Sequence, residues 1–215
     1  MIFVKYPEPG KVKTRLGSEI GFQEAASLYR LFMEQTFELA QRSSAEKKYV
    51  AFAPGDREAS FSEIIPESFE LVPQDGRTLG ARMLNAFQCT FEAGADGTVI
   101  LGSDSPTLPL QFLEAAFATL TKHDLVLGPA EDGGYYLIGM KEYHPGIFES
   151  IEWSSSSVLE TTLRKAKESQ LRTKLLKTWY DIDDKPTLVR AANDDRSGRI
   201  QAFLQTQLDT FPRDK

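Results

Sequence analysis

The sequence has almost no cysteine and no long apolar run, and these two absences exclude several classes of protein. Cys89 is the single cysteine among 215 residues, so neither an intramolecular disulfide framework nor a cluster of thiolate metal ligands can form. We expect Cys89 to pack within a helix. No run of about 18 apolar residues and no basic leader with a cleavage site occurs, which predicts a cytoplasmic protein without a membrane span or signal peptide.

The chain also lacks an excess of positive charge. It has 25 Lys and Arg against 31 Asp and Glu, giving a formal net charge of -6. Because nucleic-acid binding needs a broad basic surface, this composition argues against it, and we expect any bound anion to be small. Apolar residues make up 41% of the chain, enough for one good core. We therefore predict a single domain over residues 1–215.

Short apolar runs alternate with amphipathic stretches. The continuous run Val99–Leu101 between glycines is typical of a central parallel strand buried on both faces. Apolar residues spaced by three and four predict helices from Phe22 to Ala40 and from Leu79 to Phe91, with others over 110–120 and 158–166. Further strands are predicted in MIFVKY, KKYVAFAP, FELVPQ, DLVLGPA, GGYYLIGM and the start of TWYDIDDKPTLVRAAND, which then continues as an acidic turn and two short helices. This alternation predicts an α/β fold with a mostly parallel sheet.

Polar clusters follow four of the predicted strands. A basic loop follows the first strand, and GSDSP, AEDGG and DIDDKP follow three later ones. Ligands of open α/β sheets bind in the crevice outside the carboxyl ends of the strands. We therefore expect these four segments to meet in one site.

The loop after the first strand reads KYPEPGKVKTRLG and combines rigid turns with positive charge. Pro9 and Gly10 turn the backbone sharply. Cationic and hydroxyl donors suited to diphosphate oxygens follow them, namely Lys11, Lys13, Thr14 and Arg15. The spacings of the P-loop and of the G-x-G-x-x-G motif are both absent. The alternative interpretation is a solvated basic surface loop.

Asp104 directly follows the most apolar strand and precedes a proline. A carboxylate leaving a buried strand at the sheet edge suits Mg²⁺ or Mn²⁺, which usually takes one or two carboxylates together with substrate phosphates and water. Asp181 and Asp183 are the candidates for a second ligand. The alternatives are a helix cap at Asp104 and a simple acidic turn at residues 181–184, where Asp184 is a good helix-capping residue.

Six segments of the sequence together match a known family in order and spacing. They read VKYPEPGKVKTRLG, QDGRTLGARMLNAF, LGSDSPTL, LGPAEDGGYYLIG, IEWSSSSVL and YDIDDKPTL, and span nearly the whole chain. The chain resembles the bacterial glycosyltransferase-like family of the nucleotide-diphospho-sugar transferase superfamily. More distantly, it is similar to the guanylyltransferases that activate 2-phospho-lactate or phosphoenolpyruvate and to the molybdenum-cofactor guanylyltransferase. The resemblance implies a three-layer α/β/α sandwich of the GT-A type.

The resemblance also implies roles for individual residues near the phosphates. The segment from Pro9 to Arg15 matches the one that holds the nucleotide phosphates, and Asp104 matches the metal-binding aspartate of the superfamily. Asp183 is similar to a second metal ligand in the guanylyltransferase relatives. The chain departs from many metal-dependent glycosyltransferases at GSDSP, where a single carboxylate replaces the Asp-x-Asp pair.

Other matching positions imply contacts farther from the phosphates. Gly80 would let a nucleobase or ribose approach the backbone, and Arg82 would contact phosphate or acceptor, with a surface ion pair as its alternative. Asp132, in the DGG turn, would lie on the acceptor side of the crevice, with an ordinary turn as its alternative. Trp153 matches the Trp-Ser pair of the family, and we interpret it as a core residue.

The function implied is a transferase that uses a nucleotide-activated donor and a divalent ion, Mg²⁺ or Mn²⁺. Glycosyl transfer from a nucleotide sugar to a small-molecule acceptor ranks first. Nucleotidyl transfer from a nucleoside triphosphate to a small phosphorylated acceptor is the alternative. A non-catalytic nucleotide-binding regulator is the third hypothesis.

Overall fold

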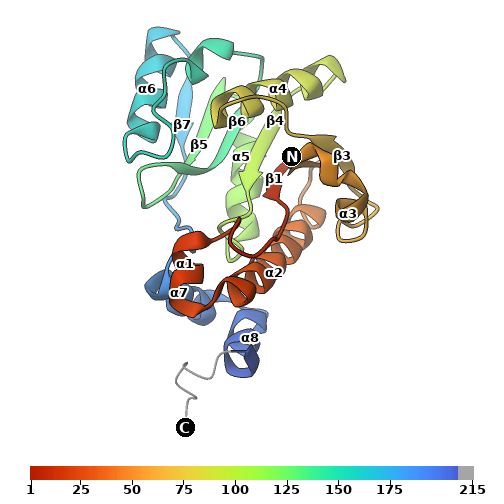
Figure 1. Cartoon of the computed structure of the whole chain (residues 1–215). Coiled ribbons are helices and arrows are strands. Elements are labelled where there is room, and N and C mark those ends of the chain that lie inside the picture. The colour runs from red at the N-terminus through yellow and green to blue at the C-terminus, as the bar shows by residue number, and fades with distance from the viewer. Residues whose placement is uncertain (208–215) are drawn as a thin grey trace.

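The computed structural model describes residues 1–207 and is built on a seven-stranded sheet with the order β3-β2-β1-β4-β6-β5-β7 (Figure 1). The last eight residues of the predicted domain lie outside the described ones. Only β6 runs antiparallel to its neighbours, so the predicted mostly parallel α/β fold is confirmed. The strands are β1 (Ile2–Lys5), β2 (Tyr49–Ala53), β3 (Glu70–Pro73), β4 (Thr98–Gly102), β5 (Leu125–Pro129), β6 (Tyr135–Met140) and β7 (Thr173–Leu175).

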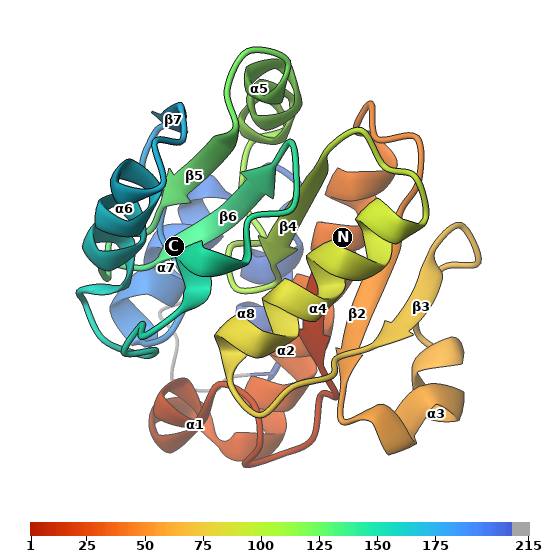
Figure 2. The same ribbon diagram turned by 90° about the horizontal axis from the view of Figure 1, so that it is seen from above.

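Helices cover both faces of the sheet and complete three layers (Figure 2). One face carries α4 (Leu79–Glu92) and α6 (Val158–Glu168). The other carries α2 (Phe22–Gln41), α5 (Leu110–Leu120), α7 (Lys185–Asp194) and α8 (Arg199–Gln207). The short helices are α1 (Thr14–Ile20), α3 (Glu58–Ser62) and the 3-10 turns η1 (Gly55–Arg57) and η2 (Pro145–Phe148). No helix within residues 1–207 is both long and apolar enough to cross a membrane.

The central strand β4 shows how the apolar pattern produces these layers. Val99 and Leu101 pack with the layer that contains α5, and Ile100 packs with the layer that contains α4. Burial of each such side chain contributes about 1.5–3 kcal/mol. Because β1 pairs in parallel with β4 through Ile2 and Phe3, the loops after these two strands leave the same edge of the sheet side by side.

Two expectations about local structure are wrong. The predicted last strand around Trp179 is a loop with one isolated bridge to Ala130, and the strand lies upstream at β7. The apolar alternation there arises because Tyr180 and Ile182 are buried against the helices from a loop. Cys89 is in α4 as predicted, but it is exposed rather than packed.

Candidate nucleotide and metal site

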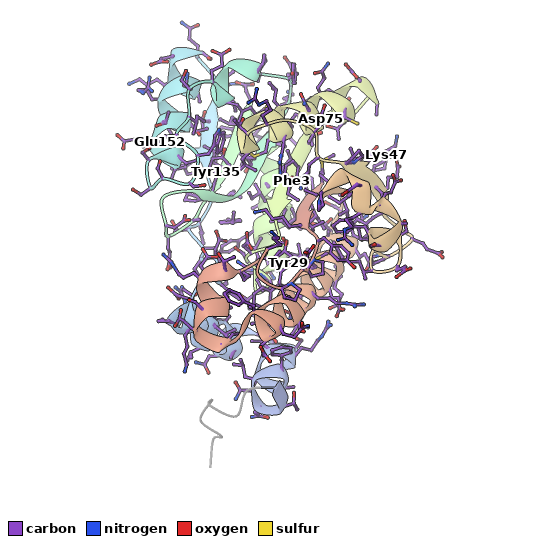
Figure 3. All side chains as sticks on the ribbon, viewed as in Figure 1. Phe3, Tyr29, Lys47, Asp75, Tyr135 and Glu152 are labelled. Carbon is purple, nitrogen blue, oxygen red and sulfur yellow. The ribbon has the colours of Figure 1, made fainter. Side chains whose placement is uncertain are left out.

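The four polar segments meet at the carboxyl edge of the sheet around a cavity of about 730 Å³. Lys11, Lys13, Thr14 and Arg15 line it from the basic loop, and Asp104, Asp132, Asp181 and Asp183 line it from the other three segments. Phe3, Tyr29 and Tyr135 contribute aromatic side chains to its walls from β1, α2 and β6 (Figure 3). The prediction that the four segments form one crevice is therefore confirmed.

Lys13 is the centre of the charged part of this cavity. Its side chain is only 4% exposed, and its Nζ lies 2.5 Å from Asp104 Oδ1 and 3.0 Å from Asp183 Oδ1. Burial alone would lower the pKa of Lys13, but the two carboxylates outweigh burial and hold this pKa well above its ordinary value. Lys13 is therefore a buried ammonium shared by the two residues predicted to ligate a metal.

The backbone of Lys13 is unusual for a lysine. Its φ of 45° places it in the left-handed region, immediately before α1. A non-glycine residue in this region costs of order 1–3 kcal/mol and persists only where its surroundings fix it. The turn directs the side chain from the loop toward Asp104 and Asp183. Neither α1 nor this turn at Lys13 was predicted from the sequence.

A third carboxylate lies beneath the pair. Asp181 accepts a hydrogen bond of 2.5 Å from the Ser105 hydroxyl. Burial and the charge of Asp104 raise the pKa of Asp181 from 3.8 to about 7. Asp104 and Asp183 are 49% and 48% exposed, whereas Asp181 lines the cavity with a carboxyl group that is more deeply buried.

Buried hydroxyls support the strand ends from below. The Tyr29 hydroxyl accepts a hydrogen bond from the Lys5 backbone N–H and lies 2.8 Å from Ser103 Oγ. Ser103 Oγ also donates to the Phe3 carbonyl. Tyr29 and Ser103 thus tie α2 to the ends of β1 and β4. Sequence reasoning missed both residues, because Tyr29 reads simply as one apolar position of a helix.

Asp132 lies in a tight turn on another wall of the cavity. Its Oδ1 accepts a hydrogen bond of 2.8 Å from the Gly134 backbone N–H. Gly133 has a φ of 91°, and a side chain on it would overlap the backbone of Ser156. The DGG turn is therefore locked against the loop of residues 153–157, and Asp132 remains exposed.

Gly80 and Arg82 are used differently from the predicted roles. A Cβ on Gly80 would overlap the indole of Trp153, so an aromatic side chain occupies the space expected for a nucleobase or ribose. Arg82 Nε donates to the Gly76 carbonyl at 3.0 Å, and neither residue is among those that line the cavity. Arg82 stabilises the turn before α4 rather than forming a surface ion pair. Trp153 is half-buried on the core and lines the cavity.

The remaining residues of the basic loop divide into two groups. Pro9 and Gly10 shape the turn, with a φ of 75° at Gly10, and are not among the lining residues. Lys11 and Arg15 are exposed cations on the cavity, and Arg15 is 3.8 Å from an Asp184 oxygen. Asp184 caps α7 by accepting from the Thr187 backbone N–H, as its alternative interpretation predicted.

The donor set fits a hard divalent ion that is completed by a ligand. No three His, Cys, Asp or Glu side chains in residues 1–207 gather in a metal-holding group. Asp104 and Asp183 nevertheless place two carboxylate oxygens on one cation, the Lys13 ammonium. Two carboxylates plus phosphate oxygens and water are a usual shell for Mg²⁺.

Comparisons with solved structures identify the fold. The chain is 33% identical to a protein from Desulfovibrio desulfuricans G20 described as a "putative nucleotide-diphospho-sugar transferase", covering 99% of this chain and 97% of that one with a TM-score of 0.89. A 4-diphosphocytidyl-2C-methyl-D-erythritol synthase from Anaerococcus prevotii DSM 20548 is 8% identical over 89% and 95% of the chains, with a TM-score of 0.57. The inositol-1-phosphate CTP transferase of T. maritima is 13% identical over 96% of both chains, with a TM-score of 0.56.

The sequence comparisons identify the family. No curated protein has a significant match to this chain. Residues 36–155 match the family model described as "Uncharacterized protein conserved in bacteria (DUF2064)". This match spans more than half of the chain, and the Desulfovibrio protein shares its fold over almost the full length. The chain is therefore a member of the DUF2064 family with the nucleotide-diphospho-sugar transferase fold.

Proposed function

We propose that this protein is a transferase that binds a nucleotide-activated donor through its diphosphate and a divalent ion, and that glycosyl transfer from a nucleotide sugar is its reaction. The observation that carries the proposal is the convergence of Lys13, Asp104 and Asp183 at the edge of the cavity. Cationic donors and exposed carboxylates together suit a metal-bound diphosphate, whereas a purely structural ion pair would need only one carboxylate.

The roles of the residues follow from where they lie. Asp104 and Asp183 would hold Mg²⁺ or Mn²⁺, which when bound stabilises negative charge on the leaving diphosphate. Lys11 and Arg15 would bind the phosphate oxygens from the open side of the cavity. Asp132, across the cavity on a rigid turn, would accept the proton of an acceptor hydroxyl. Gly80 would affect the site indirectly by setting the position of Trp153. Arg82 would affect it indirectly by holding the turn before α4.

Nucleotidyl transfer is the second candidate. It is favoured by the positions of the two carboxylates, since Asp104 follows strand β4 whereas Asp183 lies in the separate loop before α7, rather than both in one Asp-x-Asp pair. The resemblance to guanylyltransferases, and the fold shared with a protein named as a CTP transferase, favour the same chemistry. The acceptor would then be a small phosphorylated molecule.

A two-stage experiment tests these proposals. Thermal shift with nucleoside diphosphates, triphosphates and nucleotide sugars, each with and without Mn²⁺, should identify a stabilising donor, because a ligand stabilises in proportion to the logarithm of its concentration over Kd. Incubation with that donor should then release nucleoside diphosphate in glycosyl transfer or pyrophosphate in nucleotidyl transfer. Binding without either product would support the regulator hypothesis. No stabilisation by any nucleotide with Mn²⁺ would overturn the proposal.

A further inference from the structure

The metal position already contains a cation that belongs to the protein. Lys13 Nζ lies within 3.0 Å of one oxygen from each predicted ligand, so it neutralises one of their two negative charges. A divalent ion that binds the same oxygens would be repelled by the ammonium at this short range. An ion that takes the Oδ1 atoms of Asp104 and Asp183 therefore displaces the Lys13 ammonium from them.

A second anionic partner for Lys13 would bind in the same cavity. Lys13 lines the same cavity as Lys11 and Arg15, the residues proposed to bind the diphosphate. If an ion takes the carboxylates, the displaced ammonium needs a new anionic partner, because an unpaired buried charge is costly. A phosphate oxygen of the donor provides that partner.

We propose that Lys13 is an internal placeholder for the divalent ion, and that the ion enters tightly only together with a diphosphate that accepts the Lys13 ammonium. This inference rests on the proposed function and adds that the metal and the diphosphate bind together. Metal and diphosphate bind cooperatively, since each removes the cost of binding the other. The protein without a donor then binds free divalent ions weakly.

The opposite arrangement would make Lys13 a permanent substitute for the metal. In that case the ammonium would stay on Asp104 and Asp183 during binding and the protein would need no ion. Exposure of the carboxylates argues against this arrangement. Lys13 is almost fully buried, whereas both aspartates are about half exposed, so their oxygens remain open to an ion from the solvent side.

The test measures Mn²⁺ affinity, without turnover, from the electron paramagnetic resonance signal of the free ion. Wild type and Lys13→Met are each titrated with Mn²⁺ alone and with Mn²⁺ plus pyrophosphate. We expect Lys13→Met to bind Mn²⁺ alone at least about tenfold more tightly than wild type, within the usual range of coupling between sites. We also expect pyrophosphate to tighten Mn²⁺ binding in wild type and to lose most of this effect in the variant.

The matched control is Lys5→Met. Lys5 is an exposed lysine that lines the same cavity, and among the described residues no carboxylate lies within ion-pair distance of it. This control removes the same charge without freeing Asp104 or Asp183, so its affinity for Mn²⁺ alone should change by less than about twofold. Lys13→Gln serves if Lys13→Met does not fold, as judged by circular dichroism.

The outcomes separate this inference from the proposed function. Equal or weaker Mn²⁺ binding by the Lys13 variants overturns the placeholder, even if Mn²⁺-dependent nucleotide binding is found. Tighter binding by Lys5→Met to the same degree also overturns it, because the effect would then be one of general charge. Absence of Mn²⁺ binding in wild type and all variants overturns both proposals. Tighter binding by Lys13→Met with no product from any donor would keep the placeholder and reject the transferase.

Discussion

Two ion-paired clusters lie at opposite edges of the sheet and differ in their balance of charge. At the amino edge, before β5 and β7, Asp124 receives three hydrogen bonds of 2.7–3.0 Å from Arg172. At the carboxyl edge, Lys13 alone serves Asp104 and Asp183, with Asp181 beneath them. The first cluster pairs one charge with one charge, whereas the second has an excess of negative charge.

This difference in charge balance distinguishes a structural ion pair from a candidate site. The pair of Asp124 and Arg172 is complete, because the guanidinium fork satisfies the carboxylate, and it has no further need for a partner. The cluster at Lys13 has two carboxylates for one ammonium. It lines a cavity, and Lys13 has a left-handed backbone conformation. This excess of carboxylate at a cavity is the feature that the proposed metal site requires.

The largest effect is expected for Asp104→Asn. It removes one of the two accessible carboxylates, and a catalytic ion contributes several kcal/mol to charge stabilisation. We expect Mn²⁺-dependent turnover of the donor to fall by about 1000-fold or more, with loss of Mn²⁺-dependent nucleotide binding in a calorimetric titration. Asp124→Asn is the control from the other edge and should leave binding unchanged. Equal losses in the two variants would mean that Asp104 has no role that Asp124 lacks.

The next effect is expected for Asp132→Asn. An asparagine Oδ1 still accepts from the Gly134 N–H, so the turn should persist, but the proton acceptor is lost. Turnover with the true acceptor should fall by about 100-fold, at the lower end of general-base contributions, while donor affinity stays near wild type. Glu131→Gln is the control, since Glu131 pairs with Arg190 at 2.8 Å. A collapse of donor affinity would place Asp132 on the nucleotide side.

A smaller effect is expected for Arg15→Ala. Arg15 is 70% exposed, and a hydrogen bond from a charged group to phosphate contributes about 1.5–3 kcal/mol. Solvent reduces this contribution, so we expect nucleotide affinity to weaken by about tenfold with little change in thermal stability. Arg30→Ala, on the outer side of α2, provides the control. Wild-type affinity in Arg15→Ala would mean that this end of the loop is only surface.

The smallest effect is expected for Arg172→Ala at the amino edge. Hydrogen bonds from Arg172 lower the pKa of Asp124 from 3.8 to about 2. A lowered folded-state pKa stabilises the protein above pH 3.8, and this contribution is lost as the pH falls toward 2. Because the Arg172 side chain is 62% exposed, the unfolding midpoint at pH 7 should drop by about 2 °C or less. The difference from wild type should vanish near pH 2, and a difference that persists there would contradict the assignment.

The sequence predicted most of the layers because apolar spacing encodes them directly. The run Val99–Leu101 and the helical spacing of α2 both match the structure. It also predicted which segments meet, since the carboxyl ends of parallel strands share an edge. It could not predict that Lys13 pairs with Asp104 and Asp183, because that contact joins residues 91 and 170 positions apart through a left-handed turn. The apolar alternation around Tyr180 misled for a related reason, since a buried loop and a strand can show the same pattern.

The contact between Gly80 and Trp153 has a consequence for the shape of the cavity. The Trp153 indole, which forms part of the cavity wall, packs against the backbone of Gly80 in α4. The ring can lie this close to the helix because glycine has no side chain. A methyl group at position 80 would push the ring away from the helix and so reshape the wall without altering any charge or hydrogen-bonding group. Residue 80 thus limits where the Trp153 ring can lie, although it belongs to the helix behind the wall and does not itself line the cavity.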